Sequence, residues 1–116
     1  MKEFYLEENE TGQEATRRTG IDKIIPGSMI DSFQFEPCGY SANGLVDGGF
    51  YWTIHVTPEM EHSYVSFETN YPEVNYQKML EKILQIFKPS HFNVVIRANK
   101  VWYNFATKSN SVNRLV

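Results

Sequence analysis

The segment CGYSANGLVDGGFYWTIHVTPE, residues 38–59, contains two runs of strand-forming residues separated by a short polar turn. The first run covers Gly39–Leu45, and the second, Phe50–Thr57, is rich in aromatic and β-branched side chains, which strands favour. Val46–Gly49 between them reads VDGG, a composition typical of hairpin turns. Pro58 ends the second run because proline has no amide hydrogen to donate to a sheet. The segment therefore predicts a β-hairpin.

Two further strands and one helix are expected around this hairpin. Ser28–Glu36 and Ser63–Thr69 both alternate their side chains in the period of two that is typical of strands. Tyr76–Lys88 has helical spacing instead, with Asn75 available as its cap. The apolar positions of this helix are Met79, Leu80, Ile83, Leu84, Ile86 and Phe87. One face of the helix should therefore pack on the sheet.

The two ends of the chain add weaker signals. Thr11–Gly20 is compatible with one short helix that Gly20 would close in a left-handed conformation. Phe92–Ala98 and Val101–Thr107 read as two more strands of a hairpin that turns at residues 99 and 100. The sum is an α+β domain, in which a covering helix packs on an antiparallel sheet.

Composition limits the possible functions of the chain. Its 116 residues suffice for one domain, and a hydrophobic content of 41% predicts a folded core. The net charge of -3 and the scattered Lys and Arg residues argue against a nucleic-acid partner. No apolar run approaches the roughly 20 residues that a membrane helix needs. The single cysteine, Cys38, cannot form an internal disulfide, so a reducing cytosolic compartment is expected.

Ser41 and His55 are the first candidates for chemistry, because they lie on the two strands of the predicted hairpin. A serine hydroxyl beside an imidazole can donate, accept or pass a proton, since histidine titrates near pH ~6.5. The alternative is a strand serine beside a histidine with only structural hydrogen bonds. Both interpretations stay open on spacing alone.

Other residues that could have a catalytic or binding role could equally have a purely structural one. Cys38 is expected to be a buried small side chain rather than a nucleophile. A metal site is rejected, because the three histidines, His55, His62 and His91, have no paired-ligand spacing. Four aromatic residues could stack on a flat ligand or simply form core: Phe35, Tyr40, Tyr51 and Trp52.

Two glutamates, Glu59 and Glu68, lie on or beside the strands that flank the hairpin. An inward carboxylate is costly unless it is paired, so an inward position would suggest a polyol or a cation as ligand. Most strand glutamates face water instead.

Four ordered blocks resemble a known family. IPGSMID (residues 25–31), FEPCGYSANGL (35–45), YWTIHVTPE (51–59) and SYVSFETN (63–70) are similar to the eukaryotic S-adenosylmethionine decarboxylase proenzyme, a pyruvoyl enzyme of spermidine and spermine biosynthesis. The resemblance runs from about Phe4 to about Pro89, whereas the tail after His91 matches only loosely.

The resemblance implies a self-processing enzyme. The family's proenzyme cuts itself at a Glu-Ser bond through an acyl shift to the serine oxygen, and β-elimination then leaves a pyruvoyl group. That group forms a Schiff base with S-adenosylmethionine and acts as the electron sink for decarboxylation. In the matching positions, His55 resembles the base of the elimination and Ser41 the hydroxyl that supports the acyl shift.

The same resemblance suggests ligand contacts. Phe35 would stack on one face of the adenine, and Glu59 would accept hydrogen bonds from the ribose hydroxyls. Glu68 resembles an acidic residue of the buried site through which putrescine stimulates some members. Cys38 matches a family cysteine other than the one credited with protonating the product.

The chain also departs from the family pattern. No Glu-Ser dipeptide occurs in it, so the pyruvoyl group would come from a serine that is absent here. The family fold is a four-layer αββα sandwich of two similar halves. Residues 1–116 are expected to form a single partial domain, the C-terminal half, which would be inactive alone and would need the N-terminal half or a homologous chain as partner.

The resulting open sheet face predicts association or aggregation, and the isolated chain is expected to self-associate. The alternative function is a non-catalytic partner, similar to the prozyme paralogues that activate a full-length decarboxylase. A third possibility is a weak adenosyl-binding remnant that uses Phe35 and Glu59.

Overall fold

The computed structural model describes residues 10–59 and 61–97, which form an antiparallel sheet with helices on it. The four strands pair in chain order, and all three pairings are antiparallel. They are β1 (Met29–Gln34), β2 (Tyr40–Val46), β3 (Phe50–Thr57) and β4 (Tyr64–Thr69). The predicted α+β class is confirmed, and the central hairpin turns at residues 47–49, between the paired Val46 and Phe50.

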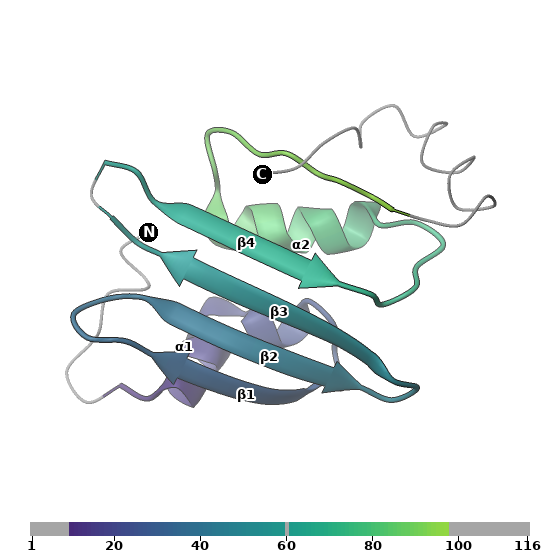
Figure 1. Cartoon of the computed structure of the whole chain (residues 1–116), viewed down its shortest axis with the longest axis horizontal. Coiled ribbons are helices and arrows are strands. Elements are labelled where there is room, and N and C mark those ends of the chain that lie inside the picture. Colours follow the sequence, from purple (N-terminus) through teal and green to yellow (C-terminus); the bar gives the residue numbers. More distant parts are fainter. Residues whose placement is uncertain (1–9, 60, 98–116) are drawn as a thin grey trace.

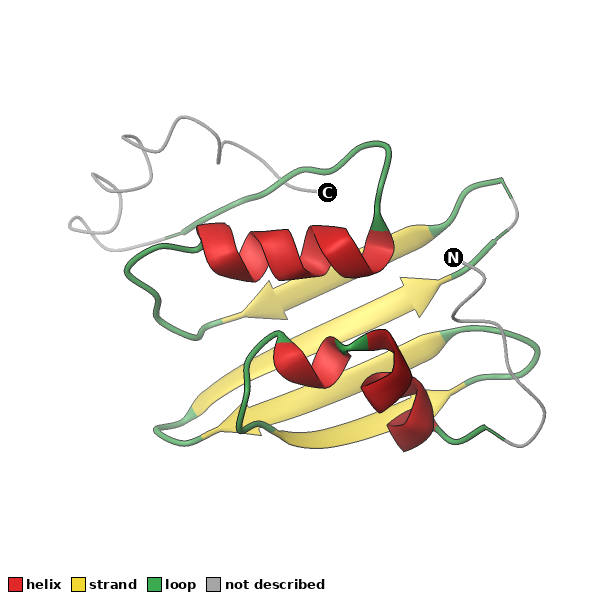
Figure 2. Cartoon of the chain, turned by 180° about the vertical axis from the view of Figure 1, so that it is seen from behind, coloured by secondary structure: helices red, strands yellow, loops and turns green. Residues whose placement is uncertain are grey.

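Two helices cover the same face of this sheet (Figure 1, Figure 2). They are α1 (Gly12–Thr19), which continues into the short 3₁₀ helix η2 (Ile21–Lys23), and α2 (Gln77–Phe87). The sequence pattern predicts only the second of these helices as a cover for the sheet, so the covering position of α1 is an addition. Within residues 10–59 and 61–97, no helix has the length and apolar character required to span a bilayer.

Local hydrogen bonds explain where the helices begin. At α1, the Thr11 hydroxyl accepts the Glu14 N–H, and the Glu14 carboxylate accepts the Thr11 N–H at 2.8 Å. At α2 the cap position is Tyr76 rather than Asn75, but the Asn75 side chain still accepts the Gln77 N–H at 2.8 Å. The predicted capping residue is therefore misplaced by one position, while its chemical role is retained.

The core lies between the sheet and the helices. Its buried members include Tyr40, Ala42, Trp52, Ile54 and Val56 from the central strands and Ile21, Ile24 and Ile25 from η2 and the residues after it. Trp52 stands directly opposite Gly44, and a Cβ atom on Gly44 would lie 2.0 Å from the Trp52 Nε1 atom. The indole N–H donates to the Ser28 hydroxyl at 2.8 Å. The absence of a side chain at residue 44 thus provides the space for the largest core residue.

The predicted strand Phe92–Ala98 is not found over its described residues. Residues 92–97 are coil and run alongside α2 (Figure 1). A run of β-forming residues becomes a strand only where a neighbouring edge supplies ladder hydrogen bonds, and a cavity separates this segment from β4. The other predicted strand of that hairpin, Val101–Thr107, lies outside the described residues.

The substitution Gly44→Ala should destabilise the fold, because the added methyl group would overlap the Trp52 ring. Forced overpacking in a core typically costs about 1–3 kcal/mol. Urea unfolding monitored by tryptophan fluorescence measures the loss. Leu45→Ala is the matched control, since Leu45 is adjacent and 62% exposed. Equal free-energy losses in the two variants would contradict the proposed packing.

Tyr40 should make the fold sensitive to alkaline pH. Burial raises the pKa of the Tyr40 phenol above 10.0, and the hydrogen bond with Thr16 lowers it only in part. Because the folded state favours the neutral phenol, its stabilisation is complete below pH ~10 and is lost as the pH rises through the raised pKa. Tyr40→Phe should cost about 1 kcal/mol at neutral pH and flatten this loss.

Urea unfolding between pH 7 and 11 measures this effect. Tyr64→Phe is the control, because Tyr64 is 50% exposed. A Tyr40→Phe profile that falls as steeply as that of the unmodified chain would show that another group causes the alkaline loss.

Candidate functional site

The candidate site lies on the sheet face that points away from the helices, called here the open face. Strand side chains alternate between the two faces, so the residues next to the buried Tyr40, Trp52 and Ile54 point outward. The open face carries Met29, Asp31, Phe33, Ser41, Asn43, Leu45, Tyr51, Thr53, His55, Tyr64, Ser66 and Glu68. None of the described helices covers it (Figure 2).

Ser41 and His55 are brought together on this face. They stand directly opposite each other on β2 and β3, and the Ser41 hydroxyl lies 2.8 Å from the His55 Nδ1 atom. When the neutral ring carries its proton on Nε2, Nδ1 accepts the Ser41 hydroxyl; a protonated ring donates to Ser41 instead. The His55 side chain is exposed. The pair can therefore exchange a proton with a group that approaches from the open side.

The neighbouring strands extend this pair into a row. Phe33 on β1 lies opposite Ser41, and Ser66 on β4 lies opposite His55. Sequence reasoning missed both residues. Their alternation within their strands was visible, but their position beside the Ser–His pair depends on the pairing register, which spacing alone does not give.

Phe35 lies just beyond β1 and is 46% exposed. Its ring packs on Phe33, with ring centroids 4.7 Å apart and planes inclined by 60°. Its backbone N–H donates to the Gly39 carbonyl at 2.9 Å, which continues the pairing of β1 with β2. An exposed aromatic surface thus adjoins the row that contains Ser41 and His55.

Glu59 follows the end of β3, which lies at the same end of the sheet as the end of β1 that precedes Phe35, because β1 and β3 are both antiparallel to β2. It follows Pro58 directly and is exposed, and its carbonyl accepts the Ser63 hydroxyl at 2.6 Å. Cys38, between β1 and β2, donates from its Sγ atom to the Pro58 carbonyl at 3.5 Å. This contact ties the loop after Phe35 to the end of β3, so the sulfur has a structural contact in this position.

Glu68 is on the open face but belongs to a different row. It stands opposite Thr53, whose hydroxyl donates to the Asn43 side-chain oxygen at 2.7 Å. It lies two positions after Ser66 in β4 and pairs near the start of β3, whereas Glu59 follows the end of β3. Glu68 therefore lies one row away from the Ser41–His55 pair on the same face.

The remaining candidates divide between core and surface. Tyr40 and Trp52 are buried under the helices and are core residues, which excludes them from stacking on a ligand, whereas Tyr51 is 44% exposed on the open face. His62 and His91 are exposed. Across the described ranges, no three His, Cys, Asp or Glu side chains converge in a way that could hold a metal ion.

Comparison with known proteins relates this chain to one family. The family model for adenosylmethionine decarboxylase matches residues 1–115. The S-adenosylmethionine decarboxylase proenzyme of Dictyostelium discoideum is 50% identical over 98 residues, which are 84% of this chain and 26% of that protein. The proenzyme of Drosophila melanogaster is 50% identical over 100 residues, which are 86% of this chain and 29% of that protein.

A solved structure supports the same relationship. The crystal structure of a Trypanosoma brucei AdoMetDC monomer superposes with a TM-score of 0.67 at 36% sequence identity, covering 76% of this chain and 36% of that one. The chain thus spans 26% and 29% of the two curated relatives named above. Because the family model covers nearly all residues and the four-stranded fold agrees, this chain belongs to the adenosylmethionine decarboxylase family.

Proposed function

We propose that residues 1–116 form the C-terminal half of a pyruvoyl-dependent S-adenosylmethionine decarboxylase. The complete cytosolic proenzyme would process itself and convert S-adenosylmethionine into decarboxylated S-adenosylmethionine for spermidine and spermine biosynthesis. The observation that carries this proposal is the Ser41–His55 pair, joined at 2.8 Å on an exposed sheet face. The chain alone would be inactive, because it has no Glu-Ser bond to cleave.

Ser41 and His55 are assigned to proenzyme processing. The Ser41 hydroxyl can donate to the carbonyl of a strained peptide bond while it exchanges its proton with His55. The His55 ring, once neutral, can remove the α-hydrogen of the ester that the acyl shift produces. Both steps need the processing segment to lie against the open face, which the exposure of His55 allows.

The residues around this pair suit a cofactor and substrate that another part of the proenzyme would bring. A bound pyruvoyl group supplies a carbonyl that withdraws electrons during decarboxylation. Phe35, supported from one side by Phe33, would stack on the adenine, because its ring is exposed and held at a fixed tilt. The exposed Glu59 carboxylate would accept hydrogen bonds from the ribose hydroxyls.

Glu68 is assigned to a separate cation site. Its exposed carboxylate adjoins the polar row of Asn43 and Thr53, which offers further oxygen atoms to an ammonium group. Putrescine would bind there without contact with Ser41 or His55. Its effect on the enzyme would therefore be regulatory.

A specific observation favours a second function, that of a prozyme-like partner which activates a full-length decarboxylase without catalysis. Large apolar side chains are exposed on the open face: Met29 is 76%, Leu45 62% and Phe33 61% exposed. Such a surface suits a contact with another chain. In this role the bond between Ser41 and His55 would have no chemical purpose.

Complementation in trans tests the first function against the second. The chain would be co-expressed with an N-terminal segment of a relative that contains the Glu-Ser site but lacks the region matched here. We expect self-cleavage and release of labelled carbon dioxide from S-adenosylmethionine. His55→Ala and Ser41→Ala should slow cleavage by at least about 10²-fold, the lower range for a lost general acid–base group.

Ser66→Ala is the matched control, because Ser66 also stands opposite His55 but makes no hydrogen bond to it among the described contacts. It should leave cleavage unchanged. If the chain instead raises the activity of an intact decarboxylase, and His55→Ala raises it equally, the partner function replaces the catalytic one.

A further inference from the structure

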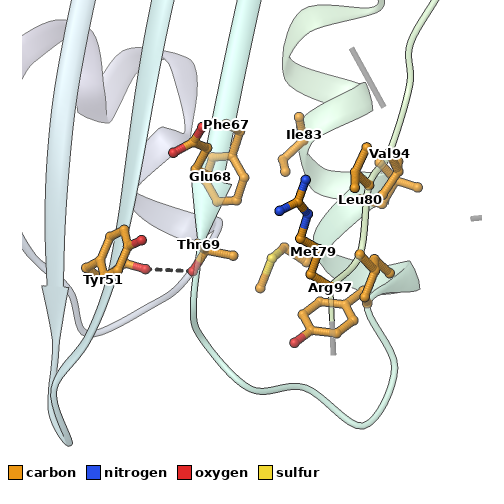
Figure 3. A pocket seen from close by; sticks show the side chains of 12 residues that line it. Tyr51, Phe67, Glu68, Thr69, Met79, Leu80, Ile83, Val94 and Arg97 are labelled. Atoms are coloured by element: carbon orange, nitrogen blue, oxygen red, sulfur yellow. Dashed lines mark hydrogen bonds between the residues drawn. The ribbon is translucent and has the colours of Figure 1, made fainter. Parts of the chain in front are cut away.

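A cavity of about 370 Å³ lies between the outer edge of β4 and the segment Val94–Arg97 (Figure 3). One wall is β4 at Phe67–Thr69, and the floor is the apolar face of α2, formed by Met79, Leu80 and Ile83. Cavities of this size are large enough to hold a bound ligand. The question is therefore which chemistry the walls of this cavity would recognise.

The backbone groups of β4 that point toward the cavity follow from its pairing with β3. The Asn70 N–H donates to the Tyr51 carbonyl at 3.3 Å, so these two residues form a hydrogen-bonded pair. Such pairs alternate along an antiparallel ladder, so the N–H and C=O groups of Val65, Phe67 and Thr69 point away from β3. They have no ladder partner among residues 10–59 and 61–97. This edge therefore offers a row of donors and acceptors to an extended chain.

Arg97 gives the cavity a positive charge. Among the described residues that line the cavity, only Glu68 and Arg97 are charged. Figure 3 shows the Arg97 side chain directed into the cavity, whereas the Glu68 carboxylate points away from it. Arg97 has no hydrogen-bond or ion-pair partner within the described part of the chain. Because a guanidinium binds carboxylates through paired N–H groups, a ligand with a carboxylate would complement this charge.

We propose that this cavity is a docking site for an extended peptide segment of another protein, which adds to β4 as a strand and places a carboxylate on Arg97. A small apolar acid would use the floor and the guanidinium, but it would leave the backbone groups of Phe67 and Thr69 unpaired. A peptide satisfies all three parts of the cavity, because addition of a strand to a sheet edge combines backbone hydrogen bonds with side-chain contacts. The proposal does not rest on the catalytic function, since Ser41 and His55 lie on other strands.

The pairing also predicts the side-chain pattern of the peptide. Side chains that stand opposite each other on paired strands share one face of the sheet, and Phe67 packs against the core on the helix side. Peptide residues opposite Phe67 and Thr69 would therefore face α2 and should be apolar. The stretch from Phe67 to Thr69 spans about 10 Å at roughly 3.3 Å per residue, so about three peptide residues would pair within the cavity.

Calorimetric titration of the full 116-residue chain with a short peptide tests this proposal. The probe is acetyl-Leu-Thr-Leu-Glu-Leu-amide, in which apolar and polar residues alternate and one carboxylate is the only charge. Arg97→Gln should weaken binding by at least about threefold, within the range for an exposed ion pair. A peptide with Gln in place of Glu should lose the same factor, and Arg97→Gln should then cause no further loss. Lys78→Gln is the matched control, because Lys78 is an exposed cation on α2 that does not line the cavity.

Hydrogen exchange locates the bound peptide. At saturation, the amides of Val65, Phe67 and Thr69 should exchange at least about tenfold more slowly, while those of the β2–β3 hairpin should be unaffected. The same peptide with methylated backbone nitrogens cannot donate to the ladder and should not bind. Equal binding of the methylated peptide would indicate a pocket for small apolar acids and would overturn the proposal. Absence of binding, protection confined to the open face, or protection of β4 that follows chain concentration alone, as in pairing with a second copy, would overturn it as well.

Discussion

The fold depends on the packing of the Trp52 indole over Gly44. A strand's side chains alternate, so a residue fixed on one face fixes the face of every other residue in that strand. Trp52 can lie under the helices only opposite a residue without a side chain, and Gly44 is its partner on β2. A slip of one residue would place the indole over a larger side chain and would turn His55 into the core. The outward position of Ser41 and His55 is thus a consequence of this packing.

The two faces of the sheet differ in how far they are covered by other parts of the chain. The inner face is covered by α1, η2 and α2 and is mainly apolar, whereas the outer face mixes exposed large apolar residues with the Ser41–His55 hydrogen bond. Hydrogen bonds and charges act more strongly where water is excluded. A proton-transfer pair on an uncovered sheet therefore reaches its full chemical effect only when another surface covers it. The apolar residues around the pair would stabilise such a cover.

Much of the fold could be predicted from the sequence because local patterns determine it. The alternation in Phe50–Thr57, the glycines after Val46 and the spacing of apolar residues in Tyr76–Lys88 each indicated the correct element. The failure at Phe92–Arg97 has the opposite cause, since a strand is defined by its partner and not by its own residues. For the same reason, the row that joins Phe33 and Ser66 to the Ser–His pair was not predictable before the register was known. The roles of Phe35, Glu59 and Glu68 came from resemblance, because spacing alone did not separate ligand contacts from solvent-exposed side chains.

The open face of the sheet and the outer edge of β4 would be covered by different kinds of interaction. A face is covered by side-chain packing, which needs a large complementary surface, whereas an edge is closed by backbone hydrogen bonds, which almost any extended segment can supply. The edge is therefore the less selective of the two surfaces.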